Sequence, residues 1–375
     1  MRAVFPTLAA AVFLAIPLVF AQTQSAPIPE PTTTLSTQST LVLVPTLVTT
    51  KAGEPVFTLT APDFTVTDDG IPQKITVEDN GGQPLALVVA VETGGAGARQ
   101  LELERPLPSM LDAIVGAVPH QVAVVSFDSA PHLAQDFTGN LDAADGALAN
   151  LQPGDDGAAI LDSIAFSVNL LKREPPEYRR AILLVSETLD HGSYVSLENA
   201  LRAISDTNTA IYTVAFSSTR SEMASEASKF SQPNTPGPAG GCMAQDPDAP
   251  PRTGKQTADQ LYECMSLLAP PLRAIRMAVM AATNGLHRNT AESVAHITGG
   301  EFFRFHDPKS MERDLIAISH HVPNRYLISF SPKTPHPGLH VLTVRLPQYP
   351  NLQISARNNY WIDEPPQPSQ SIPAR

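Results

Sequence analysis

Four nearly continuous apolar runs divide the middle of the chain, at residues 85–91, 121–127, 181–185 and 210–216. They do not alternate with polar residues, and they are rich in Val, Ile and Ala. Runs of this kind are typical of strands buried on both faces of a parallel sheet. Between them apolar residues recur at helical spacing. Strands alternating with helices predict a doubly wound, mostly parallel α/β sheet.

The helical pattern is found in six segments outside the insertion at 217–287, where residues 256–282 also show it, and two short strands complete the same region. The helices are expected over residues 101–118, 141–151, 158–171, 197–204, 292–297 and 310–320, and the strands over 131–137 and 301–305. The second of these strands follows Gly299 and Gly300, which suit the end of a helix because glycine adopts a left-handed backbone without strain.

Both flanks of this region have a different, β-rich pattern. Strands are expected around residues 41–49, 65–67 and 74–79 before it, and around 325–331, 340–346 and 352–357 after it. Pro45 marks an edge or a bulge, and Asp69-Gly70 predicts a hairpin turn. These short N-terminal strands are too few to be stable alone. We therefore expect a small β-sandwich that is split between residues 40–82 and 323–362, with the α/β domain at 83–322 inserted into it.

The remaining segments are a predicted signal for export and several polar stretches. Residues 1–21 have the short apolar run and small residues of a secretory signal peptide, with an uncleaved anchor as the alternative. Residues 22–39 are predicted to be a disordered spacer, 217–287 an insertion and 363–375 a disordered tail. Export implies a secreted or periplasmic protein in an oxidising compartment. Cys242 and Cys264, the two cysteines present, are therefore expected to form a disulfide rather than a zinc site.

Composition and motifs exclude several function classes. An apolar content of 42% is enough for a sizeable core, and a net charge of −12 disfavours nucleic acid and anionic membranes as partners. No second stretch is long and apolar enough to cross a membrane. Nucleophile-elbow, zinc-protease and phosphate-loop motifs are lacking, so we expect no catalytic activity. An exported hydrolase assembled from distant residues stays as an alternative.

Two of the buried runs end in an acid, Glu92 and Glu187. Glu92 is followed by the small residues of Thr93-Gly94-Gly95-Ala96-Gly97. Open α/β sheets place their ligand sites at the carboxyl ends of strands, where such loops meet. These two loops are therefore the first place to look for a binding site.

The order of these motifs resembles the von Willebrand factor A domain, and more closely the VWFA-related proteins of acidobacterial genomes. The resemblance covers about residues 40–362. It is carried by the segments Leu-Val-Pro at 43–45, Asp-Phe-Thr-Val to Gly-Ile-Pro-Gln at 63–73, Val-Ser-Phe-Asp at 125–128, Asp-Gly-Ala-Ala-Ile-Leu-Asp-Ser-Ile at 156–164, Leu-Leu-Val-Ser-Glu-Thr at 183–188, His-Ile-Thr-Gly-Gly at 296–300, Tyr-Leu-Ile-Ser-Phe-Ser-Pro at 326–332 and Arg-Asn-Asn-Tyr-Trp at 357–361.

Such A domains, where intact, hold a divalent cation with an Asp-x-Ser-x-Ser motif, a Thr and a second Asp. Carried onto this chain, these positions are Glu92, Gly94, Ala96, Ala158 and Glu187. Every hydroxyl ligand is missing and both carboxylates are one methylene longer. Hard cations need several oxygen ligands, so the resemblance implies a degenerate metal site and no cofactor. Weak Mg²⁺ or Ca²⁺ binding through Glu92, Glu187 and Asp190 is the alternative.

The resemblance implies a protein-binding or adhesion module whose partner the sequence does not name. The expected contact surface is the carboxyl-end face of the sheet, with the 217–287 insertion as a second candidate. An interpretation of Glu92 and Glu187 as ordinary solvated loop acids is also open. The candidate contact residues are Glu92, Thr93, Asp155, Asp156, Glu187, Thr188 and Asp190.

Overall fold

The computed structural model describes residues 41–79, 82–217 and 289–363. The predicted signal peptide and spacer lie outside these residues, as do nearly all of the predicted insertion and tail. Cys242 and Cys264 also lie outside them, so their disulfide stays a prediction. Within the described ranges, no helix combines the length and the apolar character needed to span a membrane.

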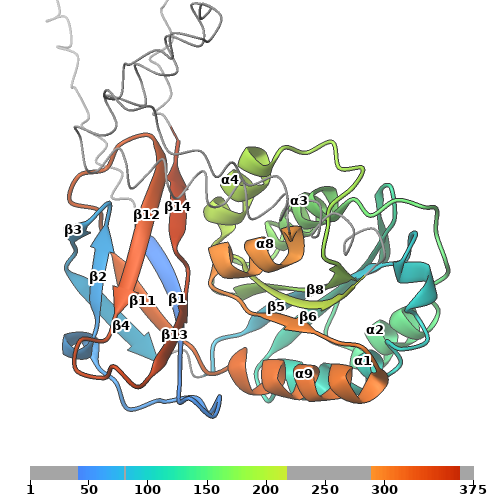
Figure 1. Ribbon diagram of the computed structural model, residues 1–375, viewed down its shortest axis with the longest axis horizontal. Coiled ribbons are helices and arrows are strands. Elements are labelled where there is room, and N and C mark those ends of the chain that lie inside the picture. The colour runs from blue at the N-terminus through green and yellow to red at the C-terminus, as the bar shows by residue number, and fades with distance from the viewer. Residues whose placement is uncertain (1–40, 80–81, 218–288, 364–375) are drawn as a thin grey trace, which may run out of the picture. The chain divides into compact units, whose positions relative to one another are not determined.

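A six-stranded sheet forms the centre of the α/β part, in the order β10-β9-β8-β5-β6-β7 (Figure 1). Every neighbouring pair is parallel except β6 and β7, which makes β7 an antiparallel edge strand. This confirms the predicted doubly wound, mostly parallel α/β fold. The strands are β5 (Leu85–Glu92), β6 (His120–Phe127), β7 (Pro131–Thr138), β8 (Arg179–Glu187), β9 (Ala210–Phe216) and β10 (Phe302–Arg304).

Helices cover both faces of this sheet, which explains why all eight residues of β5 are buried (Figure 1). Alternate residues of β5 enter two different cores: Leu87 and Val89 pack with α1, α2 and α9, whereas Val88 and Ala90 pack with α3, α4 and α8. The helices are α1 (Pro106–Val115), α2 (Leu141–Ala149), α3 (Ile160–Leu171), α4 (Leu197–Thr207), α8 (Thr290–Thr298) and α9 (Pro308–His321).

Two four-stranded antiparallel sheets are built from the flanking segments, in the orders β13-β1-β11-β4 and β14-β12-β2-β3. Apolar residues from both sheets share one core, which includes Val44, Val66, Ile328 and Tyr360. This is the small split β-sandwich of the predicted fold class. Its strands are β1 (Val42–Thr49), β2 (Thr65–Asp68), β3 (Ile71–Pro72), β4 (Ile75–Asp79), β11 (Tyr326–Phe330), β12 (Gly338–Arg345), β13 (Gln353–Ala356) and β14 (Asn359–Ile362).

Local sequence features explain several element boundaries. Asp69 and Gly70 both have positive φ, 49° and 81°, as the predicted hairpin between β2 and β3 requires. Pro45 lies in the first half of β1, which pairs with β11 on one side only. Strand β13 pairs with β1 on the other side, but only from Thr46 onward. The helix expected at 101–118 is shorter, since Pro106 occupies its first turn and α1 begins there.

The strand order reverses between β5 and β8, which lie side by side at the centre of the sheet. Ligands of open α/β sheets bind in the crevice at such a reversal, outside the carboxyl ends of the strands. Glu92 is the last residue of β5 and Glu187 the last of β8. The fold thus brings the two strand-end acids of the sequence to one place.

Candidate functional site

Three loops meet at the carboxyl ends of the parallel strands, and we call the surface formed by residues 92–97, 153–158 and 187–195 the top face. The Gly154 N–H donates to the Thr93 carbonyl at 2.8 Å, and the Gly95 N–H donates to the Asp155 carbonyl at 2.7 Å. Ala158 forms an antiparallel bridge with His191. The loops that the sequence indicated are therefore hydrogen-bonded to one another.

Glu92 lies at the base of the top face, with 0% of its surface exposed. Its Oε1 accepts the Gly97 N–H at 3.0 Å and its Oε2 accepts the Glu187 N–H at 2.7 Å. Burial is the largest influence on this group and raises the pKa of Glu92 to about 8, against the two backbone hydrogen bonds, which lower it. Its carboxyl group thus connects its own loop to the end of β8.

Glu187 is also buried, and its Oε1 lies 2.6 Å from Nε2 of His191. The interpretation of Glu92 and Glu187 as solvated loop acids is therefore wrong, because the fold encloses both side chains. His191 is a site residue that sequence reasoning missed. Its position four residues after Glu187, in the loop that was already a candidate, was the available indication.

A third acid, Glu104, belongs to the same buried group although nothing in the sequence pattern marked it. Burial, and then the negative charge of Glu92, raise the pKa of Glu104 well above its ordinary value. Among the residues that the structure describes, none donates a hydrogen bond to its buried Oε1. The side chain lines a cavity of about 490 Å³ whose wall includes Val91, Leu107 and Leu148.

The donor set does not fit the divalent cation that the resemblance would imply. Gly94 stands at the first Ser position, and a Cβ there would lie 2.1 Å from the carbonyl oxygen of Gly157. Both oxygens of Glu92 already accept backbone N–H groups. Ala96 and Ala158 supply no side-chain oxygen. With the hydroxyls missing and one of them sterically barred, too few hard oxygen ligands converge for Mg²⁺ or Ca²⁺.

The candidate contact residues separate into buried and accessible groups. Thr93 and Thr188 are buried, as are the two glutamates, so these four form the base of the top face. Asp155 and Asp156 are exposed, and Asp190 is half-buried. Hydrogen bonds from the Gly157 N–H and the Ser129 hydroxyl hold the pKa of Asp155 below its ordinary value, so it is charged at neutral pH.

Tyr194 is a further accessible residue, and it was not predicted. It is 94% exposed, and it follows Ser193, which is half-buried. Its backbone is fixed, because the Tyr194 N–H donates to Oδ2 of Asp162 at 3.0 Å and the Val195 N–H donates to Oδ1 at 2.7 Å. An aromatic ring in water on a fixed loop distinguishes this surface from a plain acidic one.

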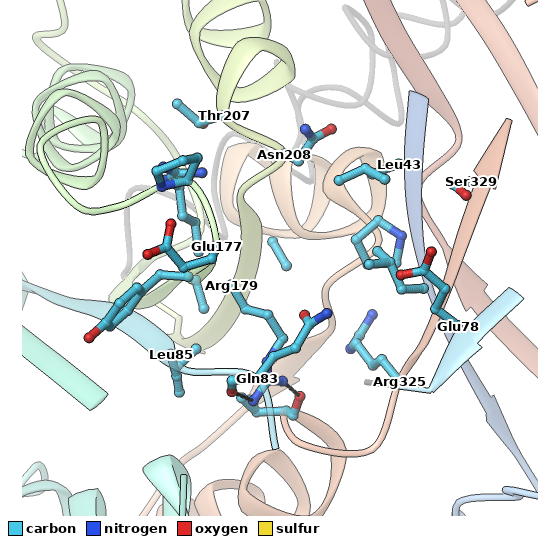
Figure 2. A pocket seen from close by; sticks show the side chains of 18 of the residues that line it. Leu43, Glu78, Gln83, Leu85, Glu177, Arg179, Thr207, Asn208, Arg325 and Ser329 are labelled. Carbon is cyan, nitrogen blue, oxygen red and sulfur yellow. Dashed lines mark hydrogen bonds between the residues drawn. The ribbon is translucent and has the colours of Figure 1, made fainter. Parts of the chain in front are cut away.

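Another cavity, of about 480 Å³, opens at the amino ends of the parallel strands (Figure 2). Its lining includes Leu85, Arg179 and Arg325, and the Arg179 guanidinium donates to the Val322 carbonyl at 2.9 Å. Ligand sites of this sheet type lie at the carboxyl ends. We therefore assign the candidate functional site to the top face and not to this cavity.

No family model matches the chain, and no curated protein sequence matches it. Von Willebrand factor A domains are among the solved structures to which it is similar. An aerotolerance-related membrane protein from Bacteroides fragilis is 14% identical with a TM-score of 0.37, over 64% of this chain and 98% of that one. Proximal thread matrix protein 1 from the mussel byssus is 9% identical with a TM-score of 0.39, over 76% and 51%.

The vWF domain of the type V pili tip protein Mfa5 from Porphyromonas gingivalis is 18% identical with a TM-score of 0.26, over 29% of this chain and 39% of that one. At these identities and TM-scores the similarities carry no argument about activity or partners. The assignment of a site therefore depends on the strand order and on the side chains at the strand ends.

Proposed function

We propose that the chain is an exported, non-catalytic module of the von Willebrand factor A type that binds a protein partner at its top face without a metal ion. The observation that carries this proposal is Tyr194, a residue that is 94% exposed on a loop held by Asp162. Tyr is enriched among residues that dominate binding energy, since it buries a large area at a small cost in conformational entropy.

The charge of this surface indicates the kind of partner. Asp155 and Asp156 are exposed at the top face, and the whole chain carries a net charge of −12. Complementary charge speeds encounter and suppresses wrong partners. The proposed partner therefore presents Lys or Arg side chains around an apolar or aromatic patch that receives Tyr194.

The cation-dependent alternative requires Glu92, Glu187 and Asp190 to share an ion. Oδ1 of Asp190 accepts the Leu161 N–H at 3.0 Å and the Ser193 hydroxyl at 2.5 Å. Glu92 is bonded to backbone N–H groups and Glu187 to His191. Each acid is thus engaged by protein donors, and an ion would have to displace several of them. This geometry favours the metal-free proposal.

The hydrolase alternative requires a nucleophile held against a histidine that acts as its base. At the top face His191 instead contacts the carboxylate of Glu187 at 2.6 Å. A carboxylate–histidine pair alone lacks the attacking hydroxyl or thiol. This observation supports a binding role over catalysis for the top face.

A quantitative capture experiment tests the proposal. The mature chain would be immobilised and exposed to native envelope extract, with and without EDTA, and retained proteins would be quantified by mass spectrometry. We expect a partner whose retention is unchanged by EDTA and falls at least about tenfold with Tyr194→Ser, as the loss of a binding hot spot predicts. Phe57→Ser is the matched control, since Phe57 is 59% exposed in the sandwich.

Loss of the partner on adding EDTA would overturn the metal-free mechanism. Retention that is equal for the wild type, Tyr194→Ser and Phe57→Ser would overturn the top face as the contact surface. Circular dichroism of each variant shows whether the fold is kept, so a folding defect is separated from a binding defect.

A further inference from the structure

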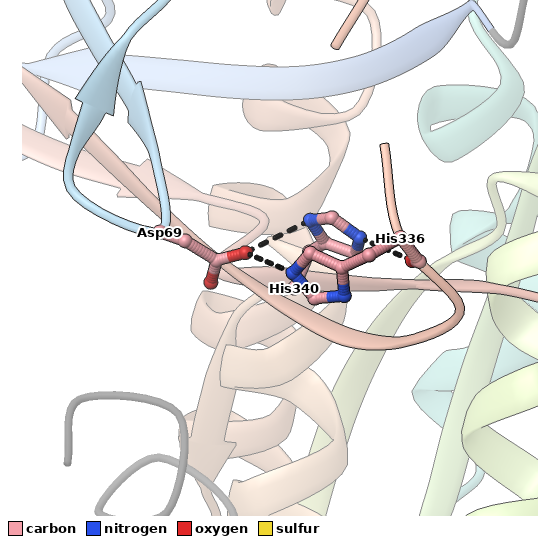
Figure 3. Close-up of side chains that lie close together, drawn as sticks. All are labelled: Asp69, His336 and His340. Atoms are coloured by element: carbon pink, nitrogen blue, oxygen red, sulfur yellow. Dashed lines mark hydrogen bonds and ion pairs between the residues drawn. The ribbon is translucent and has the colours of Figure 1, made fainter. Parts of the chain in front are cut away.

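A second group of ligand-type side chains belongs to the β-sandwich and is independent of the proposed function. It consists of Asp69, in the turn between β2 and β3, His336, in the loop before β12, and His340 of β12 (Figure 3). Each offers one ligand atom, and these atoms lie within 4.8 Å of one another. His340 is fully buried, whereas His336 is exposed.

The three side chains converge on one point. Oδ2 of Asp69 lies 3.1 Å from Nε2 of His336 and 3.0 Å from Nδ1 of His340 (Figure 3). The two imidazole rings are stacked, with their centroids 4.0 Å apart and their planes 20° from parallel. Nδ1 of His340 also lies 3.1 Å from Oδ1 of Asp68, whose Oδ2 accepts the Tyr360 hydroxyl at 2.9 Å, so this nitrogen faces two carboxylates.

Backbone groups hold the outer atoms of all three side chains. Nε2 of His340 lies 2.8 Å from the His336 carbonyl, and Nδ1 of His336 lies 3.2 Å from the Pro337 carbonyl. Oδ1 of Asp69 accepts the Val341 N–H at 3.0 Å. Metal-binding histidines characteristically donate their second ring N–H to a carbonyl or carboxylate, which fixes the tautomer and orients the ring. Here the inner nitrogens, Nε2 of His336 and Nδ1 of His340, face Oδ2 of Asp69, and an ion would have to displace the Asp68 carboxylate from Nδ1 of His340.

We propose that Asp69, His336 and His340 form a binding site for a divalent transition metal ion of the Zn²⁺ class. Two imidazole nitrogens and one carboxylate oxygen are ligands that suit Zn²⁺, whereas Mg²⁺ and Ca²⁺ prefer oxygen alone. Ligand bonds of about 2.0–2.1 Å in a tetrahedral site place the donor atoms about 3.4 Å apart. The observed 3.0 and 3.1 Å contacts are close to this spacing. Because a ring nitrogen binds a metal ion in the plane of its ring, the stacked imidazoles would also have to turn toward a common point.

The ion would connect the two halves of the sandwich. Asp69 and His336 are 267 residues apart in the sequence and belong to the N-terminal and C-terminal segments, respectively. An ion that binds the folded sandwich but not the unfolded chain stabilises the fold by mass action. Three protein ligands leave a fourth position for water. The ion would thus link the N-terminal and C-terminal segments of the sandwich, which flank the α/β part in the sequence.

Isothermal titration of the chelator-treated mature chain with ZnCl₂ tests this site, together with metal analysis after gel filtration. We expect one Zn²⁺ per chain, a dissociation constant in the micromolar range or below, and a higher melting temperature with Zn²⁺. His336→Ala should weaken binding at least about 100-fold, more than the loss of an outer-shell partner. Asp69→Asn should also weaken binding while keeping the turn, since Asn tolerates a positive φ.

His320→Ala is the matched control, because His320 is an exposed histidine at the end of α9. It should bind Zn²⁺ as the wild type does. Absence of Zn²⁺ binding by the wild type at 100-fold molar excess would overturn the proposal, and so would equal affinity in the wild type and His336→Ala. The exposed position of His336 makes its replacement compatible with folding, which circular dichroism would verify.

Discussion

At the scale of single residues, the length of Glu92 explains its contacts. Its carboxylate turns back to accept the N–H of Gly97 and also crosses to the N–H of Glu187. A Cβ at position 97 would lie 2.3 Å from the Glu92 carbonyl oxygen, so glycine is required for this close approach. The side chain of an Asp is one methylene shorter, so its carboxylate would reach the Gly97 and Glu187 N–H groups together less readily. The altered loop therefore has a structural use of its own.

The raised pKa of Glu92 makes its contribution to stability depend on pH. Between pH 4.5 and about 8 the folded protein keeps the proton that the unfolded chain releases, so this contribution falls as pH rises. The unfolding free energy of the wild type should therefore fall, relative to that of Glu92→Gln, by a few kcal/mol from pH 5 to pH 8. Each pH unit between the two pKa values contributes about 1.4 kcal/mol. Urea denaturation at several pH values measures it.

The control for this prediction is Glu102→Gln, since Glu102 is an exposed acid paired with Arg105. Its curve against pH should run parallel to that of the wild type above pH 5. A parallel curve for Glu92→Gln as well would contradict the assignment of a buried, protonated Glu92.

Restoring the missing hydroxyl at position 94 should not restore a metal site. In Gly94→Ser the new Cβ would meet the Gly157 carbonyl at 2.1 Å and Cβ of Asp128 at 2.8 Å. We expect a loss of about 1–3 kcal/mol of unfolding free energy, the usual effect of overpacking, and no gain of Mg²⁺ affinity by calorimetry. Gly146→Ser in α2 is the control, because a Cβ there meets nothing within 4 Å. Tight Mg²⁺ binding by Gly94→Ser would refute this account.

At the scale of elements, helix α9 is fixed at its C-terminal end by a buried histidine. Nδ1 of His321 contacts the Glu301 carboxylate at 2.9 Å, and its Nε2 lies 3.1 Å from the Gly53 carbonyl. Burial lowers the pKa of His321, but the hydrogen bond and charge of Glu301 outweigh it, so the pKa lies above its ordinary value. A positive charge there also suits a helix C-terminus.

This contact predicts a second pH effect. Because the folded pKa of His321 is raised, its stabilisation is fully present below pH 6.5 and is lost as pH rises through the folded pKa. His321→Gln should therefore lower the melting temperature more at pH 6 than at pH 9, with a loss of about 1–3 kcal/mol at the lower pH. Thermal unfolding followed by circular dichroism measures it. His320→Gln should show no such dependence, and an equal effect of His321→Gln at both pH values would contradict the prediction.

Sequence patterns located the elements better than the site contacts. The run at 85–91 predicts β5 because burial on both faces requires apolar residues throughout. Strand β14 was missed, since Asn359 to Ile362 has no alternating pattern and is recognised by its pairing with β12. The burial of Glu92 and Glu104 and the contact of His191 with Glu187 result from tertiary packing, which local periodicity does not encode.

At the scale of the whole molecule, the sandwich cannot form from either flank alone. Strand β11 of the C-terminal segment lies between β1 and β4 of the N-terminal segment, and β1 lies between β11 and β13. In the second sheet β12 pairs with β2. The N-terminal strands therefore have their main hydrogen-bond partners at the other end of the sequence, and an isolated two-stranded unit is only marginally stable.

Deletion of residues 323–375 should therefore unfold the N-terminal strands and leave the α/β sheet intact. Strand β1 would lose both neighbours, β11 and β13, whereas β5 keeps its parallel neighbours β6 and β8. Hydrogen exchange followed by mass spectrometry should show loss of protection at Val42–Thr49 and retained protection at Leu85–Glu92. Deleting only residues 364–375 is the control, because it removes no described strand. Protection of β1 that survives the longer deletion would show that the N-terminal segment folds without its C-terminal partner strands.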